Sequence, residues 1–140
     1  MTTPSTIDDI LWTTHKKPGS EALRQGVVAA FAFVAAADGR AGPAERITFH
    51  ARVASSKIFA HDGADALFAD YDALVATLVA GDEGRAEVER RLVRCQDVAS
   101  RAVVLAAART ALVADGEDNE REEVALQHIA RLIGAPPNEA

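Results

Sequence analysis

The chain has 140 residues and a mass of 14.8 kDa, which suits one compact domain. Its hydrophobic fraction of 49% and mean hydropathy of −0.01 exclude an intrinsically disordered chain and a polytopic membrane protein. The formal net charge is −6, whereas proteins that bind nucleic acid concentrate positive charge. The composition therefore predicts a single folded domain that does not bind DNA or RNA.

Alanine dominates the sequence, and apolar residues recur at spacings of three and four along almost its whole length. The alternation typical of strands is missing, so we predict an all-α fold, a compact bundle of about seven helices. We expect a single helical domain over 20–137, preceded by a short helix and linker over 1–19. In chain order, the predicted helices cover residues 7–14, 21–37, 43–54, 62–79, 85–94, 98–114 and 120–133.

Local signals mark several ends of these helices. Ser20 can accept hydrogen bonds from the free amides of the helix that follows it, and Pro43 occupies a first helical turn, where proline is tolerated. The segment 81–84 is rich in glycine and is expected to break the chain between two helices. The helix over 21–37 is apolar around most of its circumference, so we expect it at the centre of the bundle.

The single cysteine, the N-terminal residues and the length of the longest apolar run argue against disulfides, a secretory signal and a membrane-spanning helix. Cys95 has no second thiol with which to form an intrachain disulfide or a multi-thiolate metal site, so we expect it to be a small buried residue. The N-terminus lacks the basic start and apolar core of a secretory signal. The longest apolar run, 27–37, is well short of the ~20 residues that cross a bilayer. We therefore expect a cytoplasmic protein.

An internal repeat appears when the chain is shifted by 77 residues. The segment 28–39 then overlays 105–116, the two Asp-Gly pairs coincide, and Glu45 overlays Glu122. The shared pattern is a buried helix, Asp-Gly, five residues, Glu and an amphipathic helix. It predicts a fold with an internal pseudo-twofold repeat.

The aspartate and glutamate of each copy flank one interhelical turn, and two interpretations stay open. Paired carboxylates beside loop carbonyls are the ligands that Ca²⁺ or Mg²⁺ prefers. Alternatively, Glu45 and Glu122 cap their helices, because each is the third residue of a predicted helix. Capping is the interpretation that the pattern alone favours. The candidate metal-ligating residues are Asp115, Glu122, Asp118, Glu117, Asp38 and Glu45.

The two copies differ in charge. Residues 115–123 contain six acids and one arginine, a net charge of −5, so the remaining residues sum to only −1. Repulsion on this scale favours a bound cation or a basic partner. In the first copy, Arg40 and Arg46 are expected to neutralise Asp38 and Glu45, so the second copy should bind a cation more tightly. The second loop lacks the glycine and the final glutamate of an EF-hand.

Signatures of the common enzymes are absent. The chain has no HExxH, GxSxG, Walker or GxGxxG motif, and its four histidines are not spaced as metal ligands. The arginines between 85 and 109 alternate with acids such as Glu87. They form either a solvated helix face with pairs such as Glu87–Arg91 or a docking patch for an acidic partner or anionic lipid, and we favour the first. We expect no enzymatic activity.

The motifs resemble those of a known family. The doubled Asp-Gly-x5-Glu at 38–45 and 115–122, the segment Ser-Ser-Lys-Ile-Phe at 55–59 and the ending Ile-Ala-Arg-Leu-Ile-Gly at 129–134 are similar to the TerB family of tellurite-resistance proteins. The resemblance implies a TerB-like helical domain without enzymatic activity. It also implies a cytoplasmic role in tellurite and stress resistance, with divalent cations at the acidic positions and with other Ter proteins as partners, some of them membrane-embedded.

Three functional hypotheses follow. The leading hypothesis is a binding protein whose acidic interhelical loops hold a divalent cation and whose helical surface docks partners, which could place it at the inner membrane face. The second is a purely structural helical adaptor whose acidic loop binds a basic partner without metal. The third, a tellurite or oxyanion reductase, is disfavoured by the single Cys95 and the absence of a cofactor motif.

Overall fold

The computed structural model describes residues 20–37, 42–55, 59, 64–114 and 120–134. These residues form helices and no strand, which confirms the predicted all-α class. Six helices are present where about seven were predicted, and the expected first helix at 7–14 lies outside the described residues. The helices are α2 (Glu21–Ala35), α3 (Pro43–Ser55), α4 (Ala64–Ala80), α5 (Asp82–Leu92), α6 (Val98–Val113) and α7 (Glu120–Leu132).

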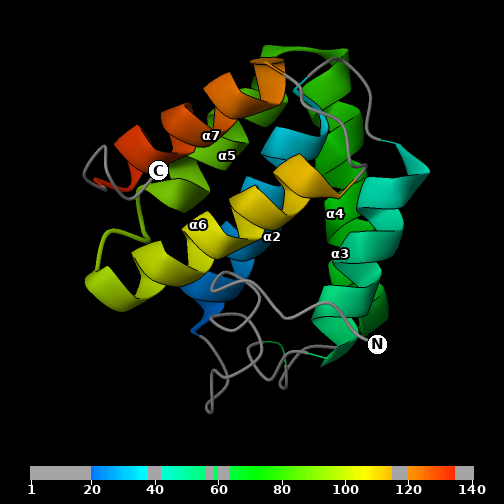
Figure 1. The fold of residues 1–140 in the computed structure, drawn as a ribbon, viewed down its shortest axis with the longest axis horizontal. Helices are drawn as coiled ribbons and strands as arrows, with labels where there is room; N and C mark the ends of the chain where they lie inside the picture. The colour runs from blue at the N-terminus through cyan, green and yellow to red at the C-terminus, as the bar shows by residue number, and fades with distance from the viewer. Residues whose placement is uncertain (1–19, 38–41, 56–58, 60–63, 115–119, 135–140) are drawn as a thin grey trace.

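Helices α2 and α6 form the centre of the bundle and pack most extensively against each other. Ten of the fifteen residues of α2 are buried, as the apolar circumference predicted. Alanines on both helices are fully buried and keep the two backbones close. In Figure 1 both helices run from the lower left to the upper right. Their C-terminal ends therefore lie at the same end of the molecule, where α3 and α7 begin.

Helices α4 and α5 are joined by a single residue, Gly81. The sequence predicted a longer break over 81–84, but α5 already begins at Asp82. The reason lies in Gly84, which is buried and where a Cβ atom would lie 2.5 Å from the backbone nitrogen of Leu78. This glycine allows α5 to approach α4 closely, so its role is packing rather than ending a helix.

Candidate functional site

The repeat predicted from the sequence is present in the structure. Helices α3 and α7 both have 13 residues and are offset by 77 residues at each end. Helices α2 and α6 begin at the same offset, and each has a side-chain N-cap. The Ser20 hydroxyl accepts a hydrogen bond from the Leu23 amide at 3.1 Å, and the Asp97 carboxylate accepts one from the Ser100 amide at 3.0 Å. The molecule thus contains two equivalent helix pairs, α2–α3 (the first pair) and α6–α7 (the second pair).

The two equivalent glutamates are both buried. Glu45 and Glu122 are the third residues of α3 and α7, with relative exposures of 4% and 1%. Burial costs a carboxylate its hydration, and the amides and dipole of a helix N-terminus offset part of that cost. A capping carboxylate can serve the same amides while it remains in contact with water. Capping a helix therefore does not require a glutamate side chain to be buried as completely as those of Glu45 and Glu122 are.

Capping nevertheless contributes to the placement of Glu45. A Cβ atom added to Gly42 would meet the Oε2 atom of Glu45 at 2.8 Å. The carboxylate therefore lies back over the residue that precedes α3, the direction in which the third-position side chain of a capping box points. The missing side chain at Gly42 leaves the space that this carboxylate occupies.

The structure describes two of the six predicted metal-ligating residues, Glu45 and Glu122. Within the described residues, no group of three or more His, Cys, Asp or Glu side chains is placed to hold a metal ion. Each helix pair thus contributes one described, buried carboxylate, in the first turn of α3 or of α7. The remaining four predicted ligands lie outside the described residues: Asp38, Asp115, Glu117 and Asp118.

Arg46 does not take the role expected from the sequence, which was to neutralise Glu45. Its Nε and Nη2 atoms donate hydrogen bonds of 3.0 and 2.9 Å to the two carboxylate oxygens of Asp72 on α4. This bidentate pair holds the pKa of Asp72 below its usual value. The guanidinium is therefore engaged by α4, while the expectation that its charge weakens cation binding in the first pair stays a prediction. The other arginine invoked there, Arg40, lies outside the described residues.

Tyr71 is a member of this region that the sequence analysis treated only as part of a helix. Its side chain is 1% exposed, and its ring stacks on Phe49 with a centroid distance of 4.4 Å and an interplanar angle of 14°. Its hydroxyl has no hydrogen-bond partner among the described residues. Burial raises the pKa of Tyr71, and the negative charge of Glu45 raises it further. The one available signal was that this is the sole tyrosine of the sequence, within an apolar helix.

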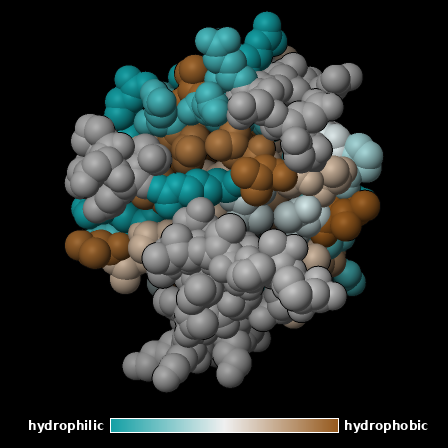
Figure 2. Space-filling view, viewed as in Figure 1, coloured by the Kyte–Doolittle hydropathy of each residue, from teal (hydrophilic) through white to brown (hydrophobic). Residues whose placement is uncertain are grey.

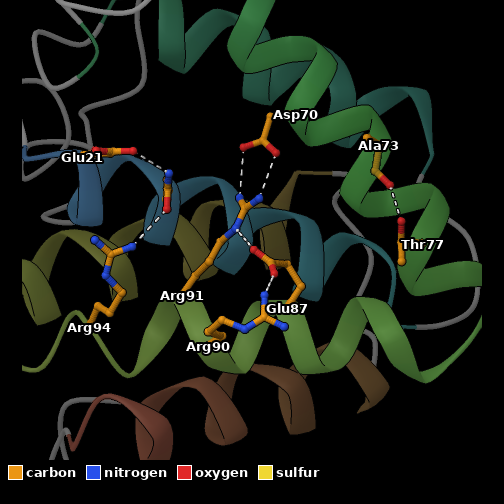
Figure 3. Close-up of polar contacts among 9 residues, drawn as sticks. Glu21, Asp70, Ala73, Thr77, Glu87, Arg90, Arg91 and Arg94 are labelled. Carbon is orange, nitrogen blue, oxygen red and sulfur yellow. Dashed lines mark hydrogen bonds and ion pairs between the residues drawn. The ribbon is translucent and has the colours of Figure 1, made fainter.

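The arginines of α5, and Arg94 just after its end, form ion pairs and hydrogen bonds with neighbouring side chains. Arg91 donates to Glu87 at 2.8 Å, as the predicted pair requires, and makes two further bonds of 3.0 Å to Asp70 on α4 (Figure 3). Its side chain is only 13% exposed. Arg90 also bonds Glu87, and Arg94 reaches α2 through a hydrogen bond to Gln25 at 3.3 Å. This network ties α5 to its two neighbours.

The other chemically reactive side chains do not assemble a catalytic group in the described residues. Cys95 is buried, which raises the pKa of its thiol to about 11, so it stays a neutral thiol. The His50 ring stacks on Phe68 with centroids 3.6 Å apart, and His128 Nε2 lies 3.4 Å from Glu89 on α5. Each of these two histidines therefore joins neighbouring helices. The remaining two histidines lie outside the described residues.

An apolar area is exposed over α6 and α7. Figure 2 shows it as brown surface in the middle of this face. Val113 and Val124 are 68% and 57% exposed, and a hollow of about 380 Å³ beside Val124 is also lined by Glu120 and Arg121. The hollow is therefore apolar with one negative and one positive side chain at its edge. In the part of the chain that the structure describes, no helix is long and apolar enough to span a membrane.

Comparison with protein families identifies a match. A family model described as "Tellurite resistance protein TerB" matches residues 24–140. The matched range includes all six helices apart from the first residues of α2, and it contains both buried glutamates. No curated protein and no solved structure matches the chain.

Proposed function

The chain belongs to the TerB family of tellurite-resistance proteins, and we propose that it is a non-enzymatic cytoplasmic stress-resistance protein that binds divalent cations and docks partner proteins. The observation that carries the proposal is the burial of Glu45 and Glu122 at equivalent positions of the two helix pairs. Each follows an Asp-Gly pair at the same spacing in the sequence. Further acidic residues lie close to each glutamate in the sequence, and a bound cation would lower the repulsion among them.

The residues present fit a hard cation. In the second pair, Glu122 would hold it together with Asp115, Glu117 and Asp118, and in the first pair Glu45 would act with Asp38. Carboxylate oxygens of this number are suitable ligands for Ca²⁺ or Mg²⁺. A bound cation supplies positive charge that offsets both the repulsion within 115–123 and the desolvation of the buried carboxylate. A cation that binds the folded state but not the unfolded state would also stabilise the protein.

Isothermal titration calorimetry with Ca²⁺ and with Mg²⁺ tests the cation claim. We expect binding by the wild type and weaker binding by Glu122→Gln and Asp115→Asn. Glu123→Gln is a matched control, because it removes the same charge from the exposed residue next to Glu122, and we expect it to bind almost as the wild type does. Binding no stronger than background in the wild type would overturn the claim.

The thermal midpoint supplies an independent measure of the same equilibrium. At a cation concentration about 100 times the Kd, linkage predicts a stabilisation of about 2.7 kcal/mol. Adding a chelator should remove this stabilisation from the wild type and should change the midpoint of Glu122→Gln by less. A chelator that leaves the wild-type midpoint unchanged while the calorimeter shows binding would mean that the cation binds the unfolded chain equally well.

Partner docking is assigned to the exposed area over α6 and α7. The hollow beside Val124 offers apolar contact between the opposite charges of Glu120 and Arg121, so an apolar segment of another Ter protein, soluble or membrane-embedded, fits its chemistry. The acidic residues of 115–123 support the alternative function, a structural adaptor whose acidic loop binds a basic partner without metal. A pull-down of Ter proteins by the wild type, with and without chelator, separates the two. Loss of capture in chelator supports the cation-dependent function, and capture that is insensitive to chelator supports the adaptor.

The absence of enzymatic activity is part of the proposal. It is supported by the buried neutral thiol of Cys95 and by the structural contacts of His50 and His128. Purified protein supplied with tellurite and a reductant should produce no turnover above the rate of the reductant alone. Turnover that disappears in Cys95→Ser would instead establish a reductase.

A further inference from the structure

His128 on α7 places one ring nitrogen between a cationic donor and an anionic acceptor of α5, the helix beside it in Figure 1. Its Nε2 atom lies 3.5 Å from the Nη2 atom of Arg85 and 3.4 Å from the Oε1 atom of Glu89. An imidazole nitrogen carries either a proton or a lone pair, so it can donate to the carboxylate or accept from the guanidinium, but it cannot do both. The two contacts are therefore alternatives.

For the neutral ring, the surrounding contacts favour Arg85 as the partner. The Nε atom of Arg85 already lies 3.7 Å from the Oε1 atom of Glu89, so the carboxylate has a positive charge beside it without the ring. The guanidinium can then serve two acceptors at once, with Nε towards Glu89 and Nη2 towards a ring nitrogen that carries a lone pair. A proton on Nε2 would instead face the Nη2 donor.

For the protonated ring, the preference reverses. Both ring nitrogens then carry protons, so Nε2 of His128 donates and no longer accepts. The imidazolium and the guanidinium of Arg85 carry like charges and repel each other, whereas a charge-assisted hydrogen bond to Glu89 becomes available. Histidine changes its charge between about pH 5 and 8, so the exchange of partners falls in the physiological range.

Phe33 on α2 supports both cationic partners of this arrangement. Its ring centroid lies 5.7 Å from that of the His128 ring and 5.8 Å from the guanidinium carbon of Arg85. The side chain of His128 is 25% exposed, so protons can reach it from solvent. The aromatic ring thus holds the imidazole and the guanidinium near each other without adding a charge of its own.

The other helices packed against α7 add no further histidine to this contact. Helix α2 presents the uncharged ring of Phe33, and its own charged residues lie more than two turns away, in its first turn. Arginines stay charged throughout this pH range, so those of α6 and α7 form a constant background. These charged residues are Glu21 and Arg24 on α2, Arg101 and Arg109 on α6, and Arg131 one turn beyond His128 on α7.

We propose that His128 is a proton-operated switch between α7 and α5, which accepts from Arg85 when neutral and donates to Glu89 when protonated. Acid thereby releases the guanidinium of Arg85 from α7. Because His128 follows Val124 by one helical turn, the charge that the ring gains lies next to the exposed apolar area over α6 and α7. The switch itself requires neither a bound cation nor a partner protein.

NMR spectroscopy of the imidazole nitrogens tests the neutral state. Long-range nitrogen–proton correlation spectra distinguish a ring protonated at Nδ1 from one protonated at Nε2, and His128→Ala assigns the signal among the four histidines. At about pH 8 we expect wild-type His128 to carry its proton on Nδ1, and Arg85→Ala to move the proton towards Nε2. A wild-type ring protonated mainly at Nε2 at this pH would overturn the proposal.

Double-mutant cycles in urea unfolding, at about pH 8 and about pH 5.5, test the exchange of partners. They combine His128→Ala with Arg85→Ala or with Glu89→Ala, and the coupling is expressed as a factor in the unfolding equilibrium constant. The coupling with Arg85 should stabilise the protein at the higher pH and destabilise it at the lower. The coupling with Glu89 should stabilise the protein by about 2- to 5-fold at the lower pH and less at the higher.

Arg90→Ala is the matched control for these cycles. It removes the same charge from α5 at a residue that bonds Glu87, so its coupling with His128→Ala should be negligible at both pH values. A coupling between His128 and Arg85 that keeps its sign at both pH values would overturn the proposal. A coupling with Glu89 that does not strengthen in acid would overturn it as well.

Discussion

Replacing Gly84 by alanine places a methyl group directly between α4 and α5. The added Cβ atom would lie 2.5 Å from the backbone nitrogen of Leu78 and 2.7 Å from its Cα atom, where ordinary contact begins at 3.4 Å. The two helices would have to separate by about 0.9 Å to restore contact distance, a difference taken from these two distances. The opposing atoms belong to a helix backbone, so they cannot rotate away as a flexible side chain would.

The expected change in the free energy of unfolding of Gly84→Ala is the sum of two opposing effects. Alanine is favoured over glycine inside a helix by about 1 kcal/mol. Overpacking a well-packed contact costs about 1–3 kcal/mol, and collision with backbone places this site at the upper end. We therefore expect Gly84→Ala to lower the free energy of unfolding by about 2 kcal/mol and the thermal midpoint by about 5–10 °C.

Urea and thermal unfolding followed by circular dichroism measure this change. Gly81→Ser is a matched control in the same turn, because a Cβ atom there meets nothing within 4 Å and its φ of 165° is extended backbone that any residue adopts. Serine also supplies the N-cap side chain that α5 lacks, so the control should be as stable as the wild type or more stable by a few tenths of a kcal/mol. A Gly84→Ala protein as stable as the wild type would refute the reasoning, since it would show that α4 and α5 separate at negligible cost.

The remaining predictions concern the N-caps and the cysteine. Ser20→Ala and Asp97→Ala should each lower the free energy of unfolding by about 1 kcal/mol at neutral pH, because each removes the side-chain acceptor of a central helix. Hydrogen bonds from Ser100 hold the pKa of Asp97 below its unfolded value of 3.8, so the stability from this cap is present above that pH and is lost as the pH falls through the lower folded pKa. The Ser20 cap does not titrate, and an equal pH dependence of the two effects in urea unfolding would contradict this assignment. Cys95 is fully buried, with its pKa raised to about 11, so thiol reagents at mildly alkaline pH should label the native protein only as fast as it unfolds; rapid labelling without unfolding would show that the site is open.

The helices themselves were largely predictable, because the signals that define them are local. Spacings of three and four located the helices, Ser20 marked the start of α2, and Pro43 marked the start of α3. The boundary between α4 and α5 was misplaced for an instructive reason. In the sequence, Gly84 resembles a helix breaker. In the fold, its lack of a side chain allows α5 to lie against the backbone of α4 at Leu78.

Part of the candidate site could likewise be predicted from the sequence, and part depends on how the helices pack. The 77-residue repeat pairs Glu45 with Glu122 in the sequence alone, since an offset between two similar segments is a property of the chain. The burial of these carboxylates, the engagement of Arg46 by Asp72 and the position of the Tyr71 hydroxyl depend on which helix faces meet. Such contacts join residues that are far apart in sequence, and periodicity within one helix carries no information about the helix that packs against it. The amino-acid order thus established the helices, their repeat and the acidic segment 115–123, whereas the packing of α3 against α4 determined that Arg46 pairs with Asp72.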